Sequence, residues 1–145
     1  MLGFDPDSSS SPIDSELQPF KDRLQELHDK AVFTVGRDGS FTMSYSKALQ
    51  VKFCIHDIGI LMIHGIRVNP AQARSLTLHS NDFNNLCHFS KVAVRTLDDG
   101  SYSFVAFQHF IGDYDQARFG VAWLIFADDL KELGENKDFI DILES

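Results

Sequence analysis

Apolar positions near the start of the chain recur with the period of a helix. One apolar stripe is formed by Ile13, Leu17, Phe20, Leu24 and Leu27. Ser11 can cap such a helix, Pro12 suits its first position, and Asp14 follows three residues after the cap. Pro19 conflicts with a continuous helix, so it either kinks the helix or moves the start to Ser15 or later.

The following segments change to the patterns of strands. Residues 31–45 hold two β-rich runs around the turn RDGS, and residues 49–55 alternate between apolar and polar positions. Residues 58–68 are apolar on both faces, which predicts a central strand. The stretch NPAQARS, residues 69–75, is interpreted as a connection.

The second half predicts a helix, a hairpin and a long helix. Residues 80–89 form the first helix, with Ser80 as its N-cap, and residues 91–110 form a hairpin around the turn DDG. The long helix over 111–133 has Asp113 as a cap and Gly134 as a stop, and residues 136–145 add a short helix. The predicted order is α-β-β-β-α-β-β-α, an α+β domain on an antiparallel sheet.

Composition supports one globular domain. The chain has 145 residues, 43% hydrophobic and 23% charged, which suits a single domain over 12–145 after a flexible tail at 1–11. The 13 Phe residues supply apolar area without hydroxyl groups. A net charge of −8 lacks the basic footprint of a nucleic-acid-binding protein and argues against an anionic membrane surface.

The two cysteines and the N-terminus favour the cytoplasm. The spacing of Cys54 and Cys87 matches no zinc or redox motif, so we expect two buried free thiols in a reducing compartment. The N-terminus lacks the pattern of a signal peptide, and no apolar run reaches membrane-spanning length.

Three asparagines within six residues open the helix predicted at 80–89. Asn81 and Asn84 are three residues apart and share a face, whereas Asn85 lies beside them in the chain. Their amides can fasten the start of the helix to nearby backbone. A polar ligand site is the alternative interpretation.

The same region resembles the YbjN-like family of bacterial proteins. The resemblance rests on the Asn81 and Asn84 pair, on Phe89, on the turn 98–100, and on Gly112 before the long helix. It covers residues 40–133 in element order and 80–130 by motif, although the end of the second hairpin strand, FQHF, departs from the family pattern. The resemblance implies a fold similar to type III secretion chaperones, frequent dimerisation and a role in sensory transduction. No catalytic residues come with it.

No residue pattern predicts an active site. The six histidines are scattered, and His56 and His64, which can face each other across a hairpin, have no ligand cluster around them. Asp98 and Asp99 suit a turn, and the pair at 128–129 suits the polar side of a helix. We therefore expect no enzyme, no metal and no cofactor.

Surplus hydrophobicity is the stronger signal. The long helix has one stripe for the core, which consists of Phe119, Trp123, Phe126, Leu130 and Leu133. A second group points away from it, and with the far face of the last strand it predicts a partner-binding surface of Val121, Leu124, Ile125, Val105 and Phe107. The alternative is that the N- and C-terminal helices cover these side chains within one chain.

The leading hypothesis is therefore a non-enzymatic protein-interaction module, chaperone-like or a regulatory adaptor. It would act as a homodimer and could bind a protein client. The alternative is a small-ligand sensor with a pocket between sheet and helices, where Asn81, Asn84 and His109 make polar contacts.

Overall fold

The computed structural model describes residues 12–45 and 49–145, which form five helices and a six-stranded antiparallel sheet. The strand order is β1-β2-β3-β4-β6-β5, so β1 and β5 are the edge strands. The predicted α+β class and antiparallel sheet are confirmed. The observed order differs from the predicted one in two ways: the two β-rich runs within 31–45 are separate strands, which gives four strands before the second helix, and one further helix lies at Pro70–Leu78. The helix at Lys137–Glu144 matches the short helix predicted at 136–145.

The chain divides into two compact units. The first contains the described residues up to Met62 together with His109–Phe119, and the second contains Ile63–Gln108 with Gly120–Ser145. Strands β4 (Gly59–Val68) and β6 (Tyr102–Ile111) and helix α4 (Gln116–Glu135) begin in one unit and end in the other. Strand β4 lies between β3 and β6, which confirms the predicted central strand.

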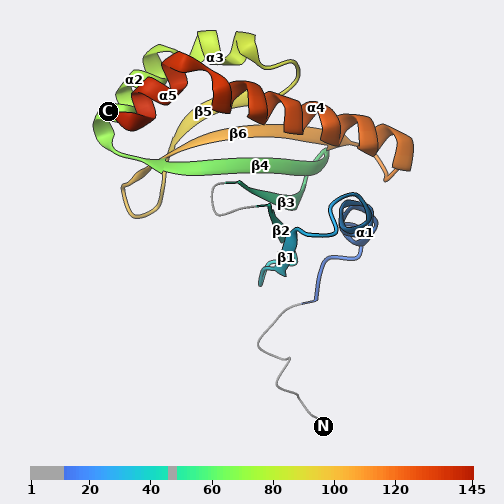
Figure 1. The fold of residues 1–145 in the computed structure, drawn as a ribbon. Helices are drawn as coiled ribbons and strands as arrows, with labels where there is room; N and C mark the ends of the chain where they lie inside the picture. The colour runs from blue at the N-terminus through green and yellow to red at the C-terminus, as the bar shows by residue number, and fades with distance from the viewer. Residues whose placement is uncertain (1–11, 46–48) are drawn as a thin grey trace. The chain divides into compact units, whose positions relative to one another are not determined.

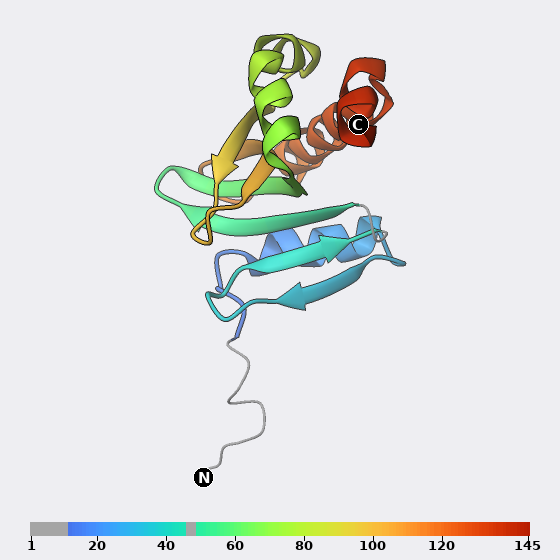
Figure 2. The same ribbon diagram turned by 90° about the vertical axis from the view of Figure 1, so that its left-hand side faces the viewer.

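The first unit is built from helix α1 (Gln18–Leu27) and strands β1 (Val32–Val35), β2 (Phe41–Ser44) and β3 (Gln50–His56). Helix α1 lies along one face of these strands (Figures 1 and 2). Phe20 of α1 meets Phe110, Tyr114 and Phe119 edge to face, at centroid distances of 4.9–5.4 Å for the first two and 4.8 Å for the last. Such edge-to-face contacts suit phenyl rings in a core.

Helix α1 begins later than its cap signal predicts. Pro19 stands in the first turn, where its missing N–H costs nothing, and Leu17 is the N-cap. The later start, one of the two alternatives, is therefore correct. Ser11 and the predicted tail at 1–11 lie outside the described residues.

The second unit places all of its helices on one side of its strands (Figures 1 and 2). These helices are α2 (Pro70–Leu78), α3 (Ser80–Leu86), α5 (Lys137–Glu144) and most of α4. The strands that they cover are β5 (Lys91–Thr96) and the adjoining parts of β4 and β6. Phe104 of β6 contacts Phe139 of α5 at 5.2 Å, and Phe83 of α3 contacts both rings. These three phenyl rings anchor the helices to the sheet.

Four local predictions were wrong. The stretch at 69–75 is not a connection but the start of α2. The Asn69 side chain accepts the Gln72 N–H, and the Gln72 side chain accepts the Asn69 N–H, which completes a capping box. The cap of α3 is His79 rather than Ser80. Helix α4 continues through Gly134 to Glu135, and Asp115 rather than Asp113 accepts the N–H of Arg118.

One glycine permits a close approach of two strands. Gly59, at φ +150°, starts β4, and a Cβ atom built there would lie 2.1 Å from the carbonyl oxygen of Phe110 in β6. Any other residue would force these backbones apart.

Candidate interaction surface

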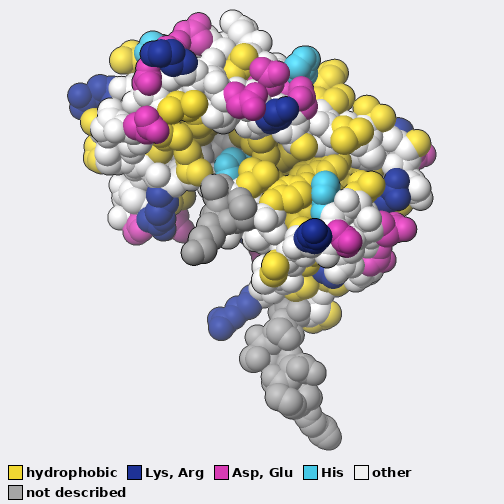
Figure 3. Space-filling view, in the orientation of Figure 1, with side chains coloured by type: hydrophobic (Ala, Val, Ile, Leu, Met, Phe, Trp, Pro, Cys, Tyr) yellow, Lys and Arg dark blue, Asp and Glu magenta, His cyan; other side chains and the backbone are white. Residues whose placement is uncertain are grey.

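Helix α4 carries apolar side chains on two sides. Its core stripe is buried, with each of Phe119, Trp123, Phe126, Leu130 and Leu133 at most 8% exposed. On the other side Val121 is 58% exposed, Leu124 is 68% exposed and Ile125 is partly buried. We call Val121, Leu124 and Ile125 the α4 stripe. Figure 3 shows hydrophobic side chains gathered along α4.

The structure does not bring Val105 and Phe107 onto that surface. Alternation in β6 turns both side chains away from Phe104, which faces the helices. Val105 is only 4% exposed and Phe107 is partly buried. Because a buried side chain cannot meet a partner without rearrangement, the α4 stripe is the exposed part of the predicted surface.

The α4 stripe ends in charged residues and an exposed phenylalanine. Asp128, one turn after Leu124, shares its face and is exposed, as are Lys131 and Glu132 beyond it. Phe89, in the loop between α3 and β5, is 65% exposed, and its backbone N–H donates to Asp129 at 3.2 Å. The surface is therefore apolar at its start and largely acidic at its end.

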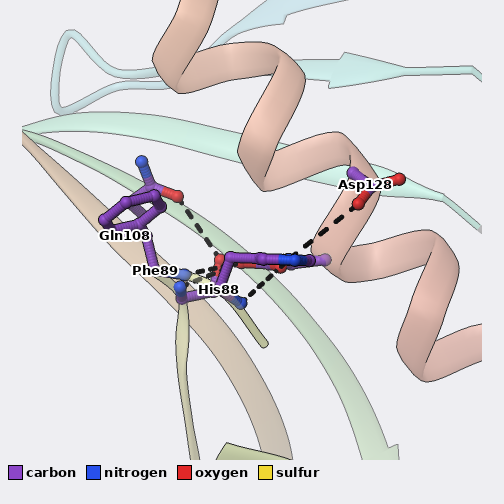
Figure 4. Close-up of polar contacts among 6 residues, drawn as sticks. His88, Phe89, Gln108 and Asp128 are labelled. Carbon is purple, nitrogen blue, oxygen red and sulfur yellow. Dashed lines mark hydrogen bonds and ion pairs between the residues drawn. The ribbon is translucent and has the colours of Figure 1, made fainter. Parts of the chain in front are cut away.

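The buried Asp129 fastens that loop to α4. Figure 4 shows His88 and Phe89 of the loop beside α4, which carries Asp128. Its carboxylate accepts the backbone N–H groups of three consecutive residues, His88 at 2.7 Å, Phe89 at 3.2 Å and Ser90 at 3.0 Å. The side chain is fully buried. The predicted position of Asp129 on the polar side of the helix is wrong, whereas Asp128 does lie there.

Opposing effects set the pKa of Asp129. Burial alone would raise the pKa, because it disfavours the charged carboxylate, but the hydrogen bonds from residues 88–90 outweigh it and hold the pKa below its usual value. The carboxylate therefore stays ionised at neutral pH. The same charge adds to burial in raising the pKa of the Cys87 thiol to about 11.

The arrangement of His88, Ser90 and Asp129 is not that of a catalytic triad. Nδ1 of His88 lies 3.1 Å from Asp129 Oδ1 and 4.0 Å from Asp128 Oδ2. The Ser90 hydroxyl, however, donates to Gln108 Oε1 at 3.4 Å, and Ser90 is only 2% exposed. A triad needs the hydroxyl bonded to the imidazole and open to substrate.

Asn84 fastens helix α3 to strand β5. Its Oδ1 accepts the Val92 N–H at 2.8 Å, and its Nδ2 donates to the Val92 carbonyl at 3.4 Å. One amide thus pairs with both backbone groups of one residue, as a neighbouring strand would. Asn81 and Asn85 are exposed, so the structure does not bring the predicted Asn81 and Asn84 together in one contact.

The remaining candidates are separate. His56 lies against His109, with ring centroids 4.8 Å apart. Asp99 holds a turn, accepting from the Ser101 N–H at 3.0 Å, which agrees with its predicted role. Within 12–45 and 49–145, no three histidine, cysteine or acidic residues are grouped so as to hold a metal ion.

A cleft of about 310 Å³ lies between α2 and the strands of the second unit. It is lined by Pro70, Ala73, Arg74, Thr77, Leu78, Val94 and Tyr102. None of the polar residues of the ligand-sensor alternative, Asn81, Asn84 and His109, is among them. Both amide groups of Asn84 are bonded to Val92.

Both cysteines are free thiols, Cys87 buried and Cys54 partly exposed, so the prediction of two buried thiols holds for Cys87 alone. None of the helices in the described part of the chain is long and apolar enough to span a membrane.

The fold matches a solved structure. The crystal structure of YbjN from E. coli, a candidate transcription regulator, superposes with a TM-score of 0.65 and covers 92% of this chain and 93% of its own. This chain has the YbjN fold. The two sequences are 18% identical, so the likeness concerns the fold, and it confirms the resemblance seen in residues 40–133 at that level. No family model and no curated protein matches the sequence.

Proposed function

We propose that this protein is a non-enzymatic interaction module, either a regulatory adaptor or a chaperone-like protein. In this proposal the protein self-associates, and it binds a protein client through the α4 stripe. The carrying observation is the exposure of Val121 and Leu124 on a helix whose opposite side is already buried. The YbjN fold, found in a candidate regulator, supports a regulatory role. The free thiols support a reducing compartment such as the cytoplasm.

The surface indicates the chemistry of its partner. Burying one aliphatic side chain contributes about 1.5–3 kcal/mol before the costs of association. Asp128 and Glu132 follow the stripe, so a partner helix with an apolar stripe and a basic end would complement it. The phenyl ring of Phe89 adds apolar area in the adjoining loop.

Substitution of Leu124 tests this proposal. Leu124→Glu puts a charge into the stripe, and we expect weaker client binding and an unchanged fold, because the side chain is 68% exposed. Ala71→Glu adds the same charge at an exposed position of α2 and serves as the control. Mass spectrometry identifies the client that co-purifies, calorimetry with that purified client measures affinity, and circular dichroism checks folding. If Leu124→Glu unfolds the chain, or if both variants bind like wild type, the α4 stripe is not the binding surface.

A further inference from the structure

The free edge of β1 presents a definite set of backbone groups. The Gly36 N–H donates to the Ser40 carbonyl at 2.8 Å, which fixes the phase of the β1–β2 ladder. Because hydrogen-bonded and non-hydrogen-bonded pairs alternate in an antiparallel ladder, Thr34 bonds to Thr42 of β2. The N–H and C=O groups of Phe33 and Val35 then point away from β2. Among the described residues no strand lies on that side, since β1 is the edge of the sheet.

The side chains along this edge suit a further strand. Phe33 and Val35 stand opposite the fully buried Met43 and Phe41, so they extend the core face of the first unit. The Phe33 ring lies 6.2 Å from that of Phe41, and Val35 is 36% exposed. The sequence VFTV favours a strand, and it lacks the charge, proline or bulge that often protects an edge.

We propose that β1 pairs antiparallel with β1 of a second copy of this chain, about a two-fold axis at Thr34. The two outward-facing residues flank Thr34 symmetrically, so Phe33 of each copy bonds to Val35 of the other through both its N–H and its C=O. The pairing places an aromatic beside a β-branched side chain, a favourable cross-strand combination. The two Thr34 side chains then face each other, on the side of the sheet opposite to Phe33 and Val35.

Charges at the two ends of β1 favour this arrangement. Lys30 precedes the strand and Asp38 follows it, so antiparallel pairing brings Lys30 of each copy near the turn that holds Asp38 of the other. Hydrogen bonds from Ser40 lower the pKa of Asp38 to about 2, so this carboxylate is ionised. Asp38 is exposed and lies 3.4 Å from Lys52. Parallel pairing would instead place like charges together.

Disulfide trapping tests the two-fold axis. Thr34→Cys should form a disulfide-linked dimer on mild oxidation, since directly opposed Cβ atoms of a non-hydrogen-bonded pair are about 4.5–5.5 Å apart. Thr42→Cys, on the same face but one strand further in, is the matched control and should remain uncrosslinked. The native Cys54 and Cys87 are present in both variants, so the wild type gives the background. No dimer, or equal crosslinking in both variants, overturns the proposal.

Charge exchange at the same position gives a second test. Thr34→Glu and Thr34→Lys should each weaken self-association about tenfold, because like charges would meet on the axis, and mixing the two should restore it. Sedimentation equilibrium measures this, and the exposure of Thr34 makes both variants safe for folding. If the wild type is monomeric and Thr34→Glu reduces client binding instead, β1 pairs with an extended client segment and the second-copy proposal fails.

This inference rests on the self-association in the proposed function but concerns a different surface, so the two can fail separately. If Leu124→Glu abolishes self-association while the Thr34 variants retain it, copies pair through α4 and not through β1. If only the Thr34 variants weaken it, β1 pairing stands, and client binding at the α4 stripe is decided by the calorimetry.

Discussion

The two edges of the sheet are treated in opposite ways. At β5, the outward N–H and C=O of Val92 are taken by the amide of Asn84, and the preceding loop is held by Asp129. At β1, the outward groups of Phe33 and Val35 meet no strand among the described residues. An exposed edge can recruit another strand. The difference is that both outward groups of Val92 at the β5 edge have a side-chain partner, whereas β1 has no strand on its outward side among the described residues, and the pairing proposed for β1 rests on this difference.

The largest effect should come from removing the carboxylate that anchors the closed edge. Asp129→Ala leaves three backbone N–H groups near a buried site without their acceptor, each worth about 1–3 kcal/mol. Because the loop can partly rearrange, we expect a loss of about 3–5 kcal/mol in the free energy of unfolding. Urea denaturation measures it. Asp128→Ala, on the exposed neighbour, should change stability by less than about 0.5 kcal/mol, and equal losses would contradict the assigned role.

A smaller effect should follow from opening the β5 edge itself. Asn84→Ala removes both bonds to Val92, so we expect a loss of about 1–3 kcal/mol and a greater tendency to aggregate through β5. Asn81→Ala, at an exposed position of the same helix, is the control. Thermal denaturation and light scattering give the two readouts, and a variant indistinguishable from wild type would mean that the edge is closed by other groups.

Acid should weaken the closed edge by protonating Asp129. The folded-state pKa of Asp129 is below its ordinary value of 3.8, so its contribution is complete above that pH and is lost as the pH falls through the lower folded-state value. Asp129→Asn should therefore show a shallower decline of stability below about pH 4 than wild type. The carboxylates of Asp38 and Asp99, whose pKa values are both about 2, titrate in the wild type and in the variant alike. Their contributions therefore cancel in the difference between the two stability profiles. Parallel acid profiles would contradict this.

The smallest effect is expected on the alkylation rate of the Cys87 thiol, which reports on opening of α3 at the closed edge. Cys87 caps the C-terminal end of α3, is 8% exposed and has a pKa raised to about 11, so native alkylation should be slow. Asn84→Ala should accelerate it, with mass spectrometry separating Cys87 from Cys54. Unchanged rates would show that α3 stays in place without its amide.

The sequence predicts the helices and strands that form the two edges better than it predicts the contacts between them. Periodicity identifies β4, the hairpin of β5 and β6, and the buried stripe of α4, because each pattern is local. The role of Asn84 is predicted in kind, as a tie from the start of the helix to nearby backbone, but the sequence does not identify the partner, which is Val92 of the next strand. Helix α2 was missed, although Asn69, Pro70 and Gln72 carry a capping signal.

The role of Asp129 could not be predicted in the same way. Its helical position lies at the border between the apolar and polar sides, and its partners are 39 to 41 residues earlier in the chain. Only the fold brings that loop to α4. The burial of Val105 could not be predicted either. Alternation along β6 does not tell which face of the strand is covered, and the structure buries this side chain.

The wide separation of Asp129 from its partners sets an order of events during synthesis. Asn84 is only 8 residues from Val92, so the amide can engage as soon as β5 emerges. The loop at 88–90 must wait for about 40 further residues, some 2–8 s at ordinary translation rates of about 5–20 residues per second. During that interval the nascent β5 edge depends on one asparagine. A chain that stalls before residue 129 would thus expose this edge to its neighbours on the same message.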